Sequence, residues 1–308
     1  MVRSASLLLS ATGLTRLAAR SALAFEVSER ETPLRRLSRT FSDLRVLHLS
    51  DLHLGSRLDL AGPLRQVLEE VTCDVAVITG DFRFRERGSF DRARTELDAI
   101  VKGLDPPYGI HAVLGNHDRA ADMTDIESCG VRILMNESTF IERQGERLWL
   151  VGVDDPHLYR LDDLPRALEG VPADDPRILL AHSPELYQEA AQAQIDLYLC
   201  GHTHGGQICL PGGLAPFVQA RCPRRYARGA WCHDGVEGYT SRGVGASGIG
   251  ARLFCPPEIV VHRLVGTKEP RVPDRPSPER REGTAPASRT EKLTAVSESE
   301  PLATAPGK

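Results

Sequence analysis

Seven short apolar runs, each of a length typical of one buried β-strand, constrain the architecture of this chain most strongly. They cover residues 46–50, 75–79, 110–114, 148–153, 178–181, 197–200 and 259–265. Apolar side chains recur at helical spacing over 60–71 and 90–101, and Ser183-Pro184 is a start signal for a third helix that runs to about Gln194. Alternating strands and helices predict an α/β fold. No helical pattern separates the strands after about residue 205, so we expect that half to be more antiparallel.

Side chains of metal-ligand type follow five of these runs. In chain order they are Asp51 and His53; Asp81; Asn116, His117 and Asp118; His182; and His202 and His204. Ligands of α/β sheets bind at the carboxyl ends of strands, so these side chains are expected to converge. One such motif alone is explained as well by a turn or by a hydrogen-bonded core histidine. Five motifs in order indicate a metal site.

The spacing and number of these side chains indicate two ions. Asp51 and His53, like His202 and His204, are two residues apart and point to the same side of extended backbone. Four imidazoles, two carboxylates and one amide oxygen give seven donors, too many for one tetrahedral zinc ion. They suit two octahedral ions that share a carboxylate. Nitrogen and oxygen ligands without thiolate favour Mn²⁺, with Fe or Zn²⁺ as alternatives.

The order of the motifs resembles the signature of the calcineurin-like metallophosphoesterases, over about residues 44–265. The matching segments are Asp51-Leu-His53, Gly80-Asp81, Gly115-Asn116-His117-Asp118, His182 and Gly201-His202-Thr-His204. The resemblance extends to a bacterial branch of small phosphohydrolases. It implies a two-sheet β-sandwich flanked by helices, an αββα four-layer fold with the metal site at the C-terminal ends of the strands.

The resemblance also implies a role for each residue. The first ion would be bound by Asp51, His53 and His204, the second by Asn116, His182 and His202, and both by Asp81. His117 would be the catalytic histidine and Asp118 would orient it. In-line attack by a metal-bridging hydroxide would then cleave a phosphomonoester, phosphodiester or pyrophosphate bond. His117 would stabilise the developing charge or protonate the leaving oxygen.

Three functions remain open at this point. The first is a phosphohydrolase acting on a small-molecule or lipid-linked phosphate ester. The second is a pyrophosphohydrolase of the UDP-2,3-diacylglucosamine type in envelope lipid metabolism. The third is a non-catalytic scaffold, which the complete ligand set and His117 disfavour. Residues 44–265 carry 31 acidic and 23 basic side chains, so we expect no nucleic-acid partner.

Other residues are weaker candidates for function, because simpler structural explanations fit them as well. Arg83, just past Asp81, and Arg225, in a basic aromatic loop, are candidate substrate ligands, although a solvated loop explains the arginines equally well. The segment 243–248 matches G-x-G-x-x-G, but no helical pattern follows it, so we interpret it as a loop. The seven scattered cysteines are expected to be free thiols. No catalytic role is expected for the remaining His48, His111 and His157.

The two ends of the chain differ from its middle. We expect one catalytic domain over 41–265, an N-terminal extension over 1–40 and a disordered, proline-rich tail over 266–308. Residues 1–25 include no apolar run long enough to span a bilayer. They fit an imperfect signal peptide, an amphipathic helix on a membrane surface, or a frayed end. The expected location is the cytoplasm, with peripheral contact to the inner face of the membrane as the alternative.

Overall fold

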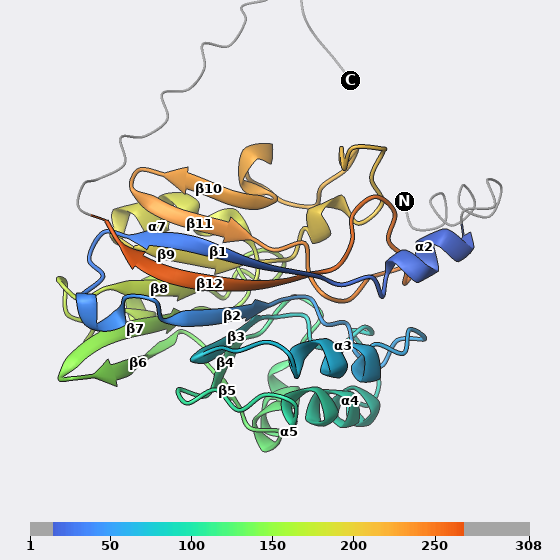
Figure 1. The fold of residues 1–308 in the computed structure, drawn as a ribbon, viewed down its shortest axis with the longest axis horizontal. Coiled ribbons are helices and arrows are strands. Elements are labelled where there is room, and N and C mark those ends of the chain that lie inside the picture. The colour runs from blue at the N-terminus through green and yellow to red at the C-terminus, as the bar shows by residue number, and fades with distance from the viewer. Residues whose placement is uncertain (1–14, 268–308) are drawn as a thin grey trace, which may run out of the picture. The chain divides into compact units, whose positions relative to one another are not determined.

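Two six-stranded sheets lie face to face in residues 15–267, the part of the chain that the computed structural model describes (Figure 1). The first sheet has the order β1 (Glu26–Leu34), β12 (Glu258–Gly266), β2 (Arg45–Leu49), β3 (Val75–Thr79), β4 (Ile110–Val113) and β5 (Val131–Ile133). The strands from β2 to β5 are parallel, and β12 is antiparallel to β2 and parallel to β1.

The second sheet has the order β10 (Gly229–His233), β11 (Val236–Thr240), β9 (Leu197–Cys200), β8 (Arg177–Leu180), β7 (Glu146–Gly152) and β6 (Glu137–Arg143). The four inner strands are parallel and the two edge strands antiparallel. The half after residue 205 is therefore mixed: β11 is parallel to β9, and antiparallel pairing is confined to β10 with β11 and β12 with β2.

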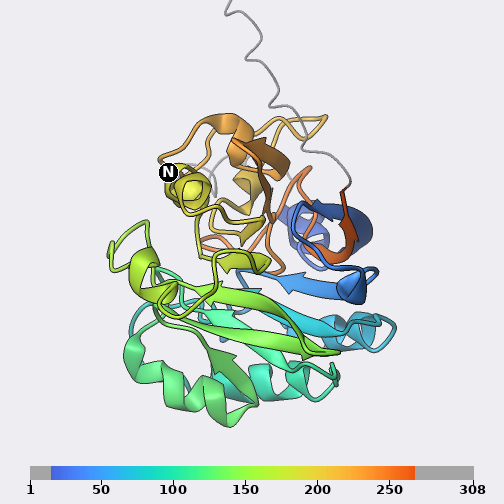
Figure 2. The same ribbon diagram turned by 90° about the vertical axis from the view of Figure 1, so that its left-hand side faces the viewer.

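Helices cover the outer face of each sheet. The longer ones are α3 (Ala61–Leu68), α4 (Asp91–Val101) and α5 (Met123–Ser128) on the first sheet, and α6 (Leu164–Ala167) and α7 (Tyr187–Gln192) on the second. Short 3₁₀ turns lie at Arg39–Phe41, Ala120–Asp122, Pro184–Leu186, His204–Gly206 and Arg224–Tyr226. Three apolar clusters separate the layers: one under each set of helices and one between the sheets. The four-layer αββα arrangement is thus confirmed, and Figure 2 gives an end view of it.

The domain begins earlier than residue 41. Strand β1 lies inside the stretch expected to be an extension, and all nine of its residues pair with β12. Its sequence, EVSERETPL, is rich in charged residues because β1 is an edge strand with one largely exposed face. The expected third helix is also shorter, since a 3₁₀ turn over Pro184–Leu186 precedes α7.

The N-terminal helix α2 (Thr15–Ser21) contacts the domain near its C-terminal loops. Ala18 packs against Ala251 and Leu253, and the Arg252 amide donates to the Ala18 carbonyl at 3.0 Å. Within residues 15–267 no helix is long and apolar enough to cross a membrane. Residues 1–14 and nearly all of the expected tail lie outside the described residues.

Candidate metal centre

The five motifs meet where β2, β3, β4, β8 and β9 end. Backbone pairing continues past β2 and β3: the Asp51 amide donates to the Gly80 carbonyl at 3.0 Å, and that of His53 to the Asp81 carbonyl at 2.9 Å. The ligand-bearing loops of the first sheet are therefore fixed to each other. They face the loops that follow β8 and β9 of the second sheet.

The first group of ligands consists of Asp51, His53 and His204, all buried. His204 Nε2 lies 3.0 Å from His53 Nε2 and 3.4 Å from Asp51 Oδ1. The ligand atoms of the three residues lie within 4.8 Å of one another. This group matches the set expected for the first ion.

The second group consists of Asn116, His182 and His202. His182 Nε2 lies 3.0 Å from Asn116 Oδ1 and 3.1 Å from His202 Nδ1. Asp81 lies between the groups, with Oδ2 3.5 Å from His53 Nε2 and Oδ1 3.5 Å from His182 Nε2. One carboxylate thus offers a different oxygen to each group.

The donor atoms fit divalent cations. Asp51 Oδ2 accepts hydrogen bonds from Ser50 Oγ at 2.6 Å and the His202 amide at 3.0 Å, whereas Oδ1 is buried and has no hydrogen-bond partner. Burial lowers the pKa of His53 to about 4 and those of His202 and His204 well below the usual value. Neutral imidazole is the form that binds a metal ion. A buried oxygen without a donor beside neutral imidazoles is what an ion would satisfy.

The carboxylates give this site a negative potential. Burial alone would lower the pKa of His182, but the nearby Asp81 and Asp51 outweigh it and raise that pKa to about 10. The pKa of Asp81 is well below its usual value: burial opposes this shift, and His182 and His53 cause it. Without an ion, the site therefore stabilises positive charge on His182, which is consistent with a cation site.

Main-chain carbonyls orient two of the imidazoles. His182 Nδ1 lies 2.8 Å from the Thr79 carbonyl, and His53 Nδ1 lies 3.3 Å from the Arg83 carbonyl. A proton on each Nδ1 leaves Nε2 free to bind an ion, the usual outer-shell arrangement of metal-binding histidines.

The backbone at five of the seven expected ligands is left-handed. The φ angles are 53° at Asp51, 46° at His53, 57° at Asp81, 69° at His202 and 51° at His204. Such angles are uncommon for residues other than glycine and store strain. They turn these side chains out of the strand direction, so the two-residue spacing used in the sequence argument does not by itself explain their convergence.

Glycine is required where the loops approach each other most closely. A Cβ on Gly80 would lie 2.7 Å from the Gly115 amide nitrogen and 2.7 Å from His182 Nδ1. A Cβ on Gly115 would overlap the Asp81 carboxylate. The glycines of the GD and GNH motifs therefore leave room for the Asp81 carboxylate and the His182 ring.

His117 lies at the solvent side of the centre, and its orientation differs from the expectation. Nδ1 lies 3.0 Å from the Phe84 carbonyl, and Nε2 lies 4.0 Å from Asp81 Oδ2. Asp118 accepts instead from the amides of Phe82, Arg83 and Gly115 at 2.9, 3.3 and 2.9 Å. Asp118 thus joins the two loops that carry Asp81 and Asn116, and Phe84 orients His117.

The structure places the two candidate substrate arginines in different surroundings. Arg83 is buried, with Nη1 2.7 Å from Asp122 Oδ2 and Nη2 2.9 Å from the Gly88 carbonyl. Its terminal nitrogens are thus hydrogen-bonded to other groups of the protein. Arg225 is exposed, and its guanidinium lies 4.7 Å from the ring centroid of Tyr226. Neither side chain has a described contact with a metal ligand.

His157 is a residue of the site that the sequence argument missed. Its ring centroid lies 4.0 Å from that of His202, and its Nδ1 lies 2.7 Å from Glu185 Oε1. No apolar run precedes it directly, so it lacked the strand-end signal that marked the ligands. No catalytic role was expected for it from the sequence.

The loop over 243–248 is a second missed contributor. It is a loop, as expected, but it packs on the first ligands: the amides of Val244 and Gly245 donate to the Ser50 and Asp51 carbonyls, both at 2.8 Å. Fully buried Arg252 donates to the Gly243 carbonyl at 2.9 Å and so holds this loop. The described cysteines form no disulfide, as expected.

The chain is similar to known proteins over the region that carries the ligands. The sequence profile described as calcineurin-like phosphoesterase matches residues 44–206. The uncharacterized metallophosphoesterase YkoQ of Bacillus subtilis is 30% identical over 231 residues, which are 72% of this chain and 83% of that protein. The phosphodiesterase YaeI of Escherichia coli is 30% identical over 230 residues, 72% of this chain and 82% of that protein.

The similarity to a vertebrate relative covers a smaller part of both chains. A Bos taurus protein described as a transmembrane protein with metallophosphoesterase domain is 34% identical over 212 residues, 61% of this chain and 46% of that protein. The profile match and the two bacterial relatives, together with the ligand groups, support a metal-dependent phosphoesterase. The chain belongs to the calcineurin-like phosphoesterase family.

Proposed function

We propose that this protein uses two divalent metal ions to hydrolyse phosphomonoester, phosphodiester or pyrophosphate bonds. The observation that carries the proposal is the position of Asp81, whose two oxygens each lie 3.5 Å from a histidine nitrogen of a different ligand group. A single ion would need only one group. Mn²⁺ is the expected ion, with Fe or Zn²⁺ as alternatives.

Each side chain has a defined task in this proposal. When bound, the ions would lower the pKa of a water molecule and hold the phosphate for in-line attack. His117 donates from Nδ1 to the Phe84 carbonyl, so Nε2 faces the centre. In its imidazolium form, with a second proton on Nε2, His117 can give that proton to the leaving oxygen and become neutral. Asp118 keeps the loops of Asp81 and Asn116 at a fixed separation.

Hydrolysis of bis-p-nitrophenyl phosphate with added Mn²⁺ tests the proposal. The wild-type protein is expected to hydrolyse it and to contain two Mn²⁺ ions per chain by elemental analysis. Asp81→Ala and His117→Ala should each lower kcat by at least about 100-fold. Asp98→Ala on the outer helix α4 is the matched control and should leave kcat unchanged. Activity that survives both site substitutions would overturn the two-metal proposal.

A lipid-linked pyrophosphate, such as UDP-2,3-diacylglucosamine, is the second candidate substrate. One observation favours it: Leu210, Leu214 and Phe217 are exposed in a loop next to exposed Phe254. Residues 203–233 contain four arginines and no acidic residue. Exposed apolar side chains among arginines suit the surface of an anionic membrane. Contact of this loop, and of residues 1–25, with the cytoplasmic membrane face is part of the same proposal.

Two assays separate the lipid candidate from a soluble substrate. The first compares kcat/KM for UDP-2,3-diacylglucosamine with that for bis-p-nitrophenyl phosphate. The second measures sedimentation with phosphatidylglycerol vesicles for the wild type and for Leu214→Ser/Phe217→Ser. A lipid substrate predicts a higher kcat/KM for the lipid nucleotide and loss of sedimentation in the variant. Equal sedimentation of both proteins would remove the membrane part of the proposal.

A further inference from the structure

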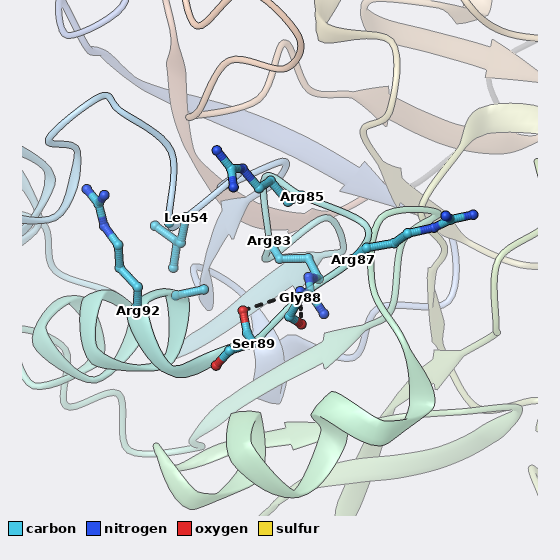
Figure 3. A pocket seen from close by; sticks show the side chains of 9 residues that line it. Leu54, Arg83, Arg85, Arg87, Gly88, Ser89 and Arg92 are labelled. Atoms are coloured by element: carbon cyan, nitrogen blue, oxygen red, sulfur yellow. Dashed lines mark hydrogen bonds between the residues drawn. The ribbon is translucent and has the colours of Figure 1, made fainter.

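A recess of about 290 Å³ lies beside the metal centre (Figure 3). Its walls come from three segments: Leu54 and Gly55 after β2, the loop over 83–89 after β3, and the first turn of α4. The volume is at the lower end of the range for ligand pockets. It is large enough for a phosphate group with a few further atoms and too small for an acyl chain.

The recess and the metal centre share their backbone. Leu54 directly follows the ligand His53 and pairs with Arg83, two residues after Asp81. The carbonyl that accepts from His117 belongs to Phe84, and the same peptide group carries the amide of Arg85. A ligand in the recess would therefore lie next to the leaving-group side of the centre, where His117 is placed.

Arginines dominate the lining. The nine lining residues include four arginines and no carboxylate. Arg83 forms part of the frame, since Asp122 and the Gly88 carbonyl bind its terminal nitrogens, while its buried Nε has no acceptor. Because Asp122 pairs with the charge of Arg83, the positive potential of the recess comes from the other lining arginines.

Two further arginines have free donors. Within residues 15–267, exposed Arg85 has no hydrogen bond or ion pair. Arg92 binds Glu96 through Nε at 2.8 Å, and no described acceptor binds its two terminal nitrogens. In Figure 3 the side chains of Arg85 and Arg92 lie on either side of Leu54, whereas that of Arg87 extends in another direction. Arg85, Arg92 and Leu54 all line the recess, so the free guanidinium nitrogens of both arginines are available to a group bound in it.

We propose that this arginine recess binds a second phosphate group of the substrate, remote from the phosphate that is cleaved. The inference rests on the proposed phosphohydrolase function and narrows its substrate class to soluble compounds with two separate phosphates. Planar guanidinium groups with free terminal nitrogens bind phosphate oxygens in pairs. The recess is concave and small, so it suits a phosphate on a compact molecule better than a flat lipid surface.

Binding of paired ligands to the Mn²⁺-loaded protein tests the inference. The probes are the bisphosphates of ethane-1,2-diol, butane-1,4-diol and hexane-1,6-diol, each compared with its monophosphate by titration calorimetry. We expect at least one bisphosphate to bind about tenfold tighter than its monophosphate, or about 1.4 kcal/mol. Arg85→Ala/Arg92→Ala should remove that advantage and leave monophosphate binding unchanged. Arg94→Ala, two residues further along the exposed side of α4, is the matched control and should retain it.

Several outcomes would overturn the inference. The first is that no bisphosphate binds more tightly than its monophosphate. The second is that the higher affinity for the bisphosphate survives in Arg85→Ala/Arg92→Ala. The third is that Arg94→Ala loses this higher affinity to the same extent as the double variant. Sedimentation with phosphatidylglycerol vesicles that depends on Arg85 and Arg92 would assign the recess to a membrane surface instead. Hydrolysis of bis-p-nitrophenyl phosphate is measured alongside for the wild type and for the Arg94→Ala control, which should have the same rate. Failure of the wild type in that assay bears on the proposed function, whereas the binding data bear on the recess.

Discussion

The Nδ1 atom of His117 lies 3.0 Å from the carbonyl oxygen of Phe84. A main-chain group therefore orients the expected catalytic histidine. This carbonyl belongs to the loop that follows Asp81, so one short segment carries both the carboxylate that lies between the two ligand groups and the carbonyl that orients His117.

This arrangement predicts that substitutions of His117 and of Phe84 affect kcat to different extents. His117→Gln should lower kcat by about 10²–10⁴-fold, because glutamine cannot transfer the proton, with Mn²⁺ content retained. Phe84→Ala should keep most of the activity because the carbonyl remains. Steady-state kinetics with elemental analysis checks both. A loss in Phe84→Ala as large as that in His117→Gln would contradict orientation by the main chain.

Asp118→Asn should destabilise the domain, because the side chain accepts from three backbone amides through both oxygens. An asparagine amide nitrogen would face one of these donors and leave it unpaired, which costs about 1–3 kcal/mol. Urea unfolding of the metal-free protein measures this. A variant with wild-type stability but a shifted pH profile of kcat would favour the orienting role instead.

His157 should influence metal binding through His202, against whose ring it packs at 4.0 Å between centroids. His157→Ala should weaken binding of the more weakly held Mn²⁺ by roughly 10-fold, as is typical for residues that support a metal ligand. His157→Phe keeps an aromatic ring in this place and should restore most of the affinity. Titration of activity with Mn²⁺ distinguishes the variants. If His157→Ala binds Mn²⁺ as tightly as the wild type, His157 does not contribute to metal binding through His202.

Stability should fall as pH drops from about 6.5 to about 4, partly because of His48. Burial lowers the pKa of His48 to about 4 in the folded protein, although Glu258 partly opposes the shift. In this window the unfolded chain binds the proton and the folded chain does not, so acid favours unfolding. The full shift corresponds to roughly 3 kcal/mol.

His48→Gln should remove part of this pH dependence. Urea unfolding of both proteins in chelator at pH 7.5 and 5.0 measures the difference. The wild type should lose more stability between these pH values than the variant. The same loss in both proteins would show that folding does not lower the pKa of His48.

The layers and the metal ligands could be predicted because each depends on a local pattern. Buried parallel strands form continuous apolar runs, and their ends carry the ligands. Strand β1 escaped detection because an edge strand with an exposed face has few apolar residues to bury. The hydrogen bonds of Asp118 and Arg83 were not predicted, because they depend on how two loops pack.

The contributions of Phe84 and His157 could not be found in the sequence for a related reason. A main-chain carbonyl is present at every position, so no residue type marks the one that binds His117. His157 is 45 positions from His202 in the chain, and only the packing of the loop after β7 brings the rings together.

The left-handed backbone at five expected ligands lowers the stability of the domain but places the side chains that would bind the metal ions. These residues are Asp51, His53, Asp81, His202 and His204. Glycine would relieve the strain at each position, by about 1–3 kcal/mol per strained residue, and would remove a metal ligand every time. A library of variants selected for heat resistance alone should therefore accumulate changes at these five positions and lose the hydrolase. Selection for both properties should leave them untouched and place its stabilising changes elsewhere in the domain.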